Sequence, residues 1–150
     1  DVYAKVLAEL EIDSTKLVVK DASGLSRSNK VTAKMIGELL YKLRKDPRFI
    51  GLHSVLPVSG VSGTLNERFI ETAPTAVGLV RAKTGSLNGT VTLAGYVESS
   101  DREYVFVTLA DEIPRGYTSL KKARAAIDKI LGRIAAPNIP AEISPLPINP

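Results

Sequence analysis

The chain has 150 residues, of which 44% are hydrophobic and 24% are charged, and its formal net charge is +4. These values are typical of one globular domain with its own core, and they exclude wholesale disorder. The chain has no cysteine and one histidine, His53, which excludes disulfides, a zinc ribbon, a cysteine nucleophile and a histidine metal cluster within it. No apolar run approaches the ~20 residues that a membrane helix needs.

The N-terminal part of the chain predicts two helices separated by a short strand. Apolar residues at helical spacing indicate a helix over residues 2–11. The apolar run at residues 17–19 indicates a short buried strand that ends at the turn cluster of residues 21–24. Thr32 is expected to cap a second helix, whose apolar stripe continues to Leu43.

Short helices and a tight loop are predicted next. Residues 49–56 are apolar and stop at a proline, which indicates a short helix. Gly60 and Gly63 indicate a tight loop. Thr64 and Glu67 have capping-box spacing, so a further short helix is expected to follow them.

The second half of the chain changes to a strand pattern. Residues 76–82, 90–97 and 103–109 are rich in β-branched and aromatic side chains. The links between these runs, residues 85–89 and 99–102, are short. Short links join antiparallel neighbours, so the sequence predicts a three-stranded meander in an α/β fold.

A last helix and a proline-rich tail complete the chain. The helix is expected to be capped at Thr118 or Ser119 and to end near Ala136. The tail, residues 137–150, contains five of the nine prolines and is expected to be extended. The predicted helices and strands therefore fall within residues 1–136, and the tail follows them.

The best candidate for a catalytic or substrate-binding site is the tripeptide Lys83-Thr84-Gly85. It is expected at the end of the first strand. The Lys83 ammonium can bind an anionic group, and the Thr84 hydroxyl can donate to a substrate carboxylate. Gly85 lets an extended peptide lie along the strand, and the Ser86 N–H can point into an oxyanion hole. A Lys-Thr-Gly tripeptide alone is weak evidence of a catalytic site. The motif does, however, occur in serine β-lactamases and penicillin-binding proteins.

The order of four segments makes the resemblance specific. They are Asp-Ala-Ser-Gly-Leu-Ser-Arg at residues 21–27, Leu-Pro-Val-Ser-Gly-Val-Ser-Gly-Thr-Leu at residues 56–65, Ala-Lys-Thr-Gly-Ser-Leu at residues 82–87 and Leu-Ala-Gly-Tyr at residues 93–96. Together they resemble the type-4 penicillin-binding proteins, the D-Ala-D-Ala carboxypeptidase/endopeptidase family (peptidase family S13). Ala22, Ser59 and Ser62 depart from the Gly, Ala and Asp that are usual there.

This resemblance implies a fold and an activity. The fold would be α/β, with the C-terminal antiparallel strands and flanking helices of a penicillin-recognising (β-lactamase/transpeptidase-like) domain. The activity would be hydrolysis of D-Ala-D-Ala ends or cross-links in peptidoglycan by serine acylation and deacylation, outside the cytoplasm of a bacterium. β-Lactams would acylate the same serine, and no cofactor or metal is implied.

The resemblance also assigns site residues. Lys83, Thr84, Gly85 and Ser86 would be catalytic, with the Ser86 N–H as an oxyanion donor. Lys83, Thr84, Ser86 and Leu87 would bind the substrate. Their simpler interpretations are an exposed strand-end lysine, β-forming residues at a turn and a glycine bulge.

The family's Ser-x-x-Lys nucleophile motif and Ser-x-Asn motif have no match at the corresponding positions. The family order places both upstream of residue 1, so we expect an N-terminal portion, in a second chain or an oligomer partner, to complete the site. The chain opens without Met, which is expected of a processed or partial protein. The Ser-x-x-Lys at residues 119–122 is interpreted as the start of a helix, and the Ser-x-Asn at residues 86–88 as part of a turn.

Two alternatives stay open. The chain could be a catalytically inactive fragment that binds cell-wall peptides or a partner protein. It could also be a basic nucleic-acid-binding domain, but five Tyr, three Phe and no Trp argue against base stacking. A serine β-lactamase is disfavoured by the segments at residues 21–27 and 56–65. Ser23, Gly24 and Ser26 are expected to shape a turn, and His53 to be a helix residue without a catalytic task.

Overall fold

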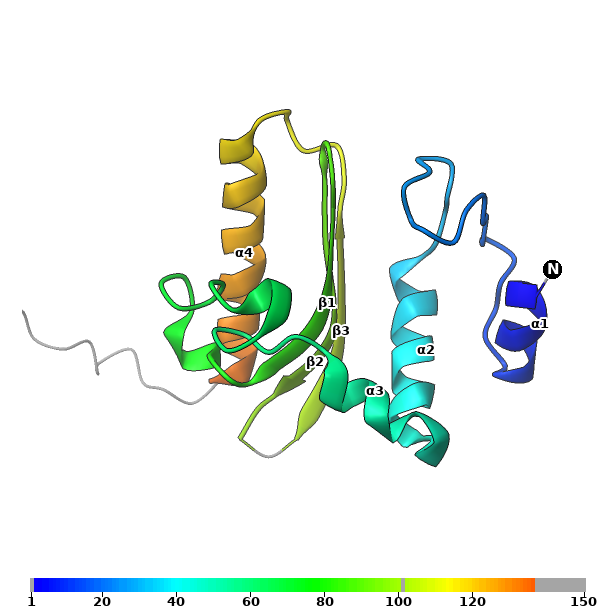
Figure 1. The fold of residues 1–150 in the computed structure, drawn as a ribbon. Helices are drawn as coiled ribbons and strands as arrows, with labels where there is room; N and C mark the ends of the chain where they lie inside the picture. Colours follow the sequence, from blue (N-terminus) through cyan, green and yellow to red (C-terminus); the bar gives the residue numbers. More distant parts are fainter. Residues whose placement is uncertain (1, 101, 137–150) are drawn as a thin grey trace, which may run out of the picture.

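The computed structural model describes residues 2–100 and 102–136. Its centre is a three-stranded antiparallel sheet of β1 (Val80–Leu87), β2 (Thr90–Glu98) and β3 (Glu103–Ala110), in the order β1-β2-β3 (Figure 1). The predicted meander is therefore confirmed. Among the described residues, no helix is long and apolar enough to cross a membrane.

The first strand begins later and ends later than predicted. Residues 74–76 form a 3₁₀ turn, η3 (Pro74–Ala76), and Gly78 follows with a φ of +81°, which interrupts extended backbone. The ladder with β2 then runs without a break from Val80 to Leu87. The tripeptide Lys83-Thr84-Gly85 consequently lies inside the strand rather than at its end. The predicted link at residues 85–89 is wrong, because Asn88 and Gly89 alone make the hairpin turn.

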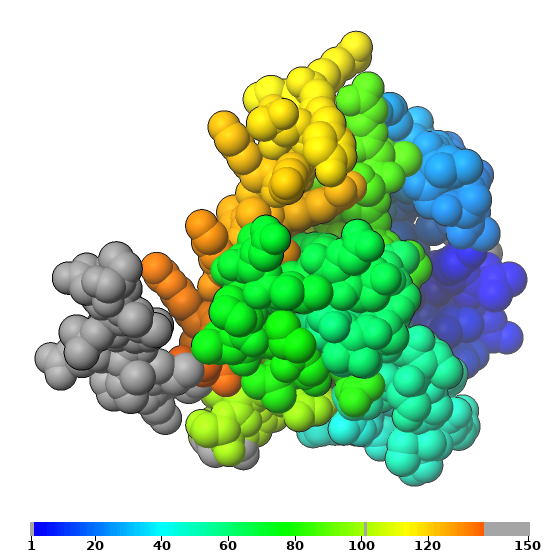
Figure 2. All heavy atoms as spheres, turned by 60° about the vertical axis from the view of Figure 1, so that its left-hand side comes forward, coloured from blue at the N-terminus to red at the C-terminus, as the bar shows by residue number. Residues whose placement is uncertain are grey.

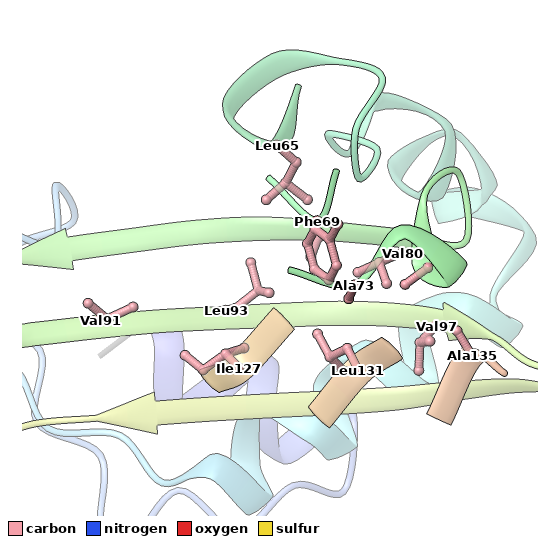
Figure 3. Close-up of a cluster of buried hydrophobic side chains, with 12 residues drawn as sticks. Leu65, Phe69, Ala73, Val80, Val91, Leu93, Val97, Ile127, Leu131 and Ala135 are labelled. Atoms are coloured by element: carbon pink, nitrogen blue, oxygen red, sulfur yellow. The ribbon is translucent and has the colours of Figure 1, made fainter. Parts of the chain in front are cut away.

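Helices cover both faces of the sheet. Figure 1 shows α4 (Tyr117–Ala135) on one face and α2 (Ala33–Lys45) and α3 (Ile50–Val55) on the other, with α1 (Val2–Glu9) beyond α2. The main core lies between the sheet and α4 (Figure 3) and includes Leu65, Phe69, Val80, Leu93, Val97, Ile127 and Leu131. Full burial of such side chains contributes roughly 1.5–3 kcal/mol each, so this contact dominates the stability of the domain.

Two predicted features of the first half are wrong. Residues 17–19 form no strand, because Val18 makes only an isolated bridge with Lys30. The capping box at Thr64 is absent: the only helical turn there is the 3₁₀ turn η2 (Gly63–Leu65), and the Thr64 hydroxyl bonds Thr84 instead. The predicted helix at residues 49–56 is confirmed as the 3₁₀ turn η1 (Pro47–Phe49) followed by α3.

The predicted N-terminal cap of α2 is confirmed, and the predicted cap of α4 is wrong. The Thr32 hydroxyl accepts from the Met35 N–H at 3.1 Å and caps α2, as expected. Thr118 and Ser119 do not cap α4, because the helix already begins at Tyr117, after Gly116 with a φ of +125°. The end of α4 at Ala135 agrees with the prediction. The proline-rich tail predicted at residues 137–150 lies outside the described residues.

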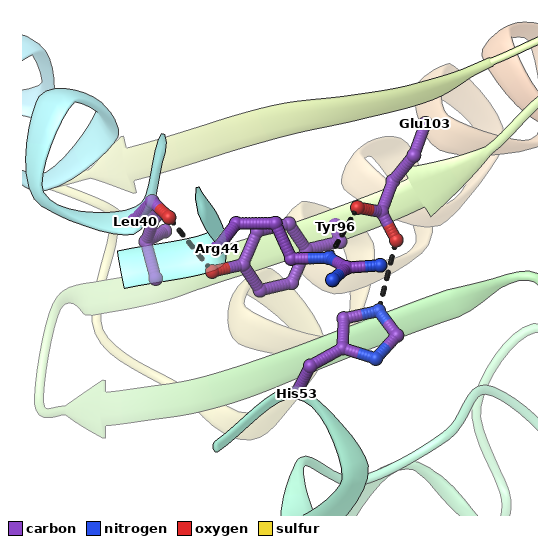
Figure 4. A network of polar contacts seen from close by, with 5 residues as sticks. All are labelled: Leu40, Arg44, His53, Tyr96 and Glu103. Carbon is purple, nitrogen blue, oxygen red and sulfur yellow. Dashed lines mark hydrogen bonds and ion pairs between the residues drawn. The ribbon is translucent and has the colours of Figure 1, made fainter. Parts of the chain in front are cut away.

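A polar network joins α2 and α3 to the sheet (Figure 4). His53 Nε2 lies 2.8 Å from Glu103 Oε2, and Arg44 Nε donates to Glu103 Oε1 at 2.7 Å. The Tyr96 hydroxyl donates to the Leu40 carbonyl at 2.9 Å. Burial, and then the charge of Glu103, raises the pKa of Tyr96 above its ordinary value. These partners give His53 a structural position between α3 and β3.

The segment between α3 and β1 packs beside α4, as Figure 2 shows for the green residues next to the orange helix. Ser59 is fully buried in this segment. Its hydroxyl donates to the Ala76 carbonyl at 2.6 Å and accepts from the Val80 N–H at 3.1 Å. Ser59 therefore fixes the entry of the chain into β1, the strand that carries the candidate site.

Candidate active site

The Lys-Thr-Gly segment lies on an edge strand. Within the described sheet β1 pairs with β2 on one side and makes only the bridge between Val58 and Arg81 on the other. On that outer side the Ala82 N–H donates to the Pro57 carbonyl at 3.0 Å. Alternate amides of a strand point to the same edge, so the Ser86 N–H also points outward, away from β2.

The side chains of this segment alternate between the two faces of the sheet. Thr84 and Ser86 are on the α4 face, where the Thr84 hydroxyl donates to the Thr64 hydroxyl at 3.0 Å. Lys83 is exposed on the opposite face, and its Nζ reaches back to donate to the Thr84 carbonyl at 2.6 Å. Among the described residues Lys83 forms no ion pair, so its charge is available to an anion in solution.

Gly85 is required by its cross-strand neighbour. It pairs with Thr92 in the unbroken ladder, which rules out the bulge considered from the sequence. A Cβ at this position would lie 2.3 Å from Thr92 Oγ1, far inside van der Waals contact. The strand therefore excludes a side chain here even without any ligand.

Replacing Gly85 by alanine is expected to destabilise the protein by about 1–3 kcal/mol, since Thr92 is β-branched and resists rotation. Urea unfolding of Gly85→Ala, of Thr92→Ala and of the double variant measures this. In the Thr92→Ala background the Gly85 substitution should be nearly neutral. An equal loss in both backgrounds would show that Thr92 is not the cause.

The loop at residues 21–29 is organised by one carboxylate. Asp21 accepts hydrogen bonds from the Ser23 hydroxyl at 2.9 Å, the Ser26 N–H at 3.0 Å and the Asn29 side-chain amide at 2.7 Å. Gly24 has a φ of +78° at the turn. The expectation that Ser23, Gly24 and Ser26 shape a turn is thus confirmed.

These hydrogen bonds, from Asn29 first and then Ser23, lower the pKa of Asp21 below its ordinary value of 3.8. A carboxylate with a lowered pKa stabilises the loop fully above pH 3.8, and that contribution is lost as the pH falls through the lower folded value. We expect the amide resonances of Gly24 and Ser26 to titrate with a midpoint below 3.8. Asp21→Asn should abolish this titration, and a midpoint at or above 3.8 would contradict the assignment.

A cleft of about 740 Å³ lies between this loop and the strands, lined by residues 23–27, 29–31, 83–87, 90, 92 and 109–111. Arg27 Nη2 donates to the Asn88 carbonyl at 2.7 Å and ties the loop to the β1–β2 hairpin. The structure thus brings Lys83, Thr84, Gly85, Ser86 and Leu87, all predicted site residues, to one wall of the cleft.

Several neighbours of the site could not be found from the sequence. Thr64 contacts Thr84, Thr92 lies opposite Gly85 across the hairpin, and Arg124 Nη2 donates to Ser86 Oγ at 3.1 Å. Thr64 belongs to the segment at residues 56–65 that carries part of the family resemblance. Its spacing with Glu67 predicted a helix cap instead of the contact with Thr84. Within the described residues, no three His, Cys, Asp or Glu side chains are grouped to hold a metal.

The comparisons with known proteins agree on one family. Residues 1–134 match the family described as Peptidase S13, the D-Ala-D-Ala carboxypeptidase 3 (S13) family. The chain is 35% identical to carboxypeptidase DacB of Mycolicibacterium smegmatis, covering 81% of this chain and 28% of that protein. It is 40% identical to a D-alanyl-D-alanine carboxypeptidase of Actinomadura sp., covering 68% of this chain and 20% of that protein.

A solved structure with the same fold supports this result. Penicillin binding protein 4 (dacB) from Haemophilus influenzae, in complex with a novel β-lactam, has a TM-score of 0.74 and 30% identity, covering 85% of this chain and 30% of that chain. The chain thus spans less than a third of the length of these relatives. The α/β fold of a penicillin-recognising domain, implied by the resemblance, is confirmed. The chain belongs to the D-Ala-D-Ala carboxypeptidase family of peptidases, S13.

Proposed function

We propose that this chain forms the Lys-Thr-Gly wall of a serine D-Ala-D-Ala carboxypeptidase/endopeptidase that acts on peptidoglycan peptides outside the bacterial cytoplasm. One observation carries the proposal: Lys83, Thr84 and Ser86 line a cleft on an edge strand, and Lys83 has no ion-pair partner among the described residues. Such a wall suits an extended peptide that ends in a carboxylate.

Each residue of the wall has a role in this proposal. Lys83 and the hydroxyls of Thr84 and Ser86 bind the terminal carboxylate of the peptide or the carboxylate of a β-lactam. The outward Ser86 N–H donates to the oxygen that becomes negative when the peptide carbonyl is attacked. Gly85 leaves the strand edge open to the peptide, in addition to accommodating Thr92.

The nucleophile comes, in this proposal, from a portion of the protein outside residues 1–150. The Ser-x-x-Lys at residues 119–122 is in the first two turns of α4 and does not line the cleft. An external serine hydroxyl would attack the carbonyl carbon, its proton would pass to the leaving D-alanine amine, and water would then hydrolyse the ester. Residues 1–136 would form the C-terminal portion of this peptidase domain, and no cofactor takes part.

Labelling with a fluorescent penicillin tests the proposal. The 150-residue chain alone should remain unlabelled, whereas the protein that also contains the nucleophile portion should take up one label per molecule. Stoichiometric labelling of the isolated chain would falsify the division of the site between two portions. No labelling of the longer protein, combined with binding of a D-Ala-D-Ala peptide without turnover, would favour the alternative of an inactive fragment that binds cell-wall peptides.

A further inference from the structure

Ser86 differs from the other two carboxylate-binding groups in its hydrogen bonds. Lys83 Nζ donates to the Thr84 carbonyl, and the Thr84 hydroxyl donates to Thr64. The one proton of the Thr84 hydroxyl is therefore engaged within the protein, whereas the Lys83 ammonium keeps two further protons for a ligand. The Ser86 hydroxyl instead accepts a hydrogen bond, from Arg124 Nη2 at 3.1 Å.

This arrangement leaves the Ser86 proton free. A guanidinium has donors and no acceptor, so the hydroxyl cannot donate back to Arg124. Within residues 2–100 and 102–136, no other group accepts the Ser86 proton. The Ser86 side chain is exposed on edge strand β1, and Ser86 is among the residues that line the cleft, so the proton is available to a ligand at this edge.

We propose that Arg124 is a positioning residue, which holds the Ser86 hydroxyl with its proton directed at the carboxylate of the ligand. The inference rests on the proposed function. A hydroxyl that accepts from a cation is polarised and becomes a stronger donor. Arg124 thereby acts on the ligand through Ser86 rather than by direct contact.

The position of Arg124 is itself fixed. Its carbonyl accepts from Arg68 Nη2 at 3.5 Å, and Arg68 also pairs with the buried Asp128, one turn further along α4. This pairing anchors α4 to the segment before β1 at the level of Arg124. The backbone from which the guanidinium extends is therefore tied to the segment before β1, as a positioning group requires.

The test uses the protein that contains both this chain and the nucleophile portion. It compares acylation rate constants for benzylpenicillin, which has the carboxylate, and for its methyl ester, which does not. Arg124→Gln should lower the ratio of acid rate to ester rate about tenfold. Arg124→Lys, which keeps a cationic donor, should restore part of the ratio, and Lys121→Gln, an equal loss of charge on α4, should leave it unchanged.

Because the ratio is taken within each variant, a loss of folded protein does not alter it. In a Ser86→Ala background, Arg124→Gln should have no further effect on the ratio. An unchanged ratio in Arg124→Gln, or an equal fall with and without Ser86, would overturn the inference. If the unsubstituted protein is not acylated by benzylpenicillin at all, the proposed function fails, and this inference fails with it.

Discussion

Lys83→Ala is expected to lower the rate of penicillin acylation by about 100-fold or more in the protein that carries the nucleophile portion. Lys83 is the one cation within the Lys-Thr-Gly segment, and it forms no ion pair among the described residues. Its loss removes a charge-assisted donor from a site that binds an anion. Stopped-flow or gel-based acylation kinetics with a fluorescent penicillin measure the effect.

The same substitution should leave stability nearly unchanged, because the Lys83 side chain is exposed and bonds only the Thr84 carbonyl. Lys129→Ala, which removes an exposed lysine from α4, is the matched control and should keep full acylation. A fall of less than about threefold in Lys83→Ala would contradict the catalytic role, since loss of an active-site donor typically costs far more.

Asp128→Ala is expected to destabilise the protein by about 3–5 kcal/mol. Asp128 is 3% exposed, pairs with Arg68 and accepts from the Thr72 hydroxyl at 3.3 Å. Removing the carboxylate leaves the half-buried Arg68 guanidinium without its counter-ion. Chemical denaturation followed by circular dichroism gives the change in the free energy of unfolding.

The exposed pair of Lys34 and Glu38 provides the control. Glu38→Ala should cost no more than about 0.5 kcal/mol, because solvent screens an exposed ion pair within one helix. Replacing both Arg68 and Asp128 by apolar residues should recover much of the lost stability. If Asp128→Ala costs no more than Glu38→Ala, the buried pair does not hold α4 to the segment before β1.

The strands and long helices were predictable because local pattern and tertiary packing agree there. The runs at residues 90–97 and 103–109 became β2 and β3 with ends shifted by one residue. The strand expected at residues 17–19 failed because an apolar triplet needs a neighbouring strand, and Val18 has only Lys30. Similarly, β1 starts at Val80 because Gly78 and the preceding 3₁₀ turn outweigh the β propensity of Val77.

The residues that form the wall of the candidate site were predictable from the sequence. The side chains that contact this wall from other elements were not. Residues 83–86, Lys-Thr-Gly-Ser, form a contiguous motif that can be read directly. Thr64, Thr92 and Arg124 reach them only through the packing of the 3₁₀ turn, the ladder and α4, and sequence spacing does not encode such contacts. The interpretation of Thr64 as a helix cap shows how a local pattern can point to the wrong partner.

A crystal structure of the penicillin-acylated protein tests the central claim most directly. The account predicts that the penicillin carboxylate lies within hydrogen-bond distance, ~2.7–3.2 Å, of the Thr84 and Ser86 hydroxyls, with Lys83 beside it. The carbonyl oxygen of the acyl ester should face the Ser86 N–H at the outer edge of β1. A carboxylate bound elsewhere, with no group of residues 83–86 within ~4 Å of the ligand, would contradict the assignment of this strand as the wall of the active site.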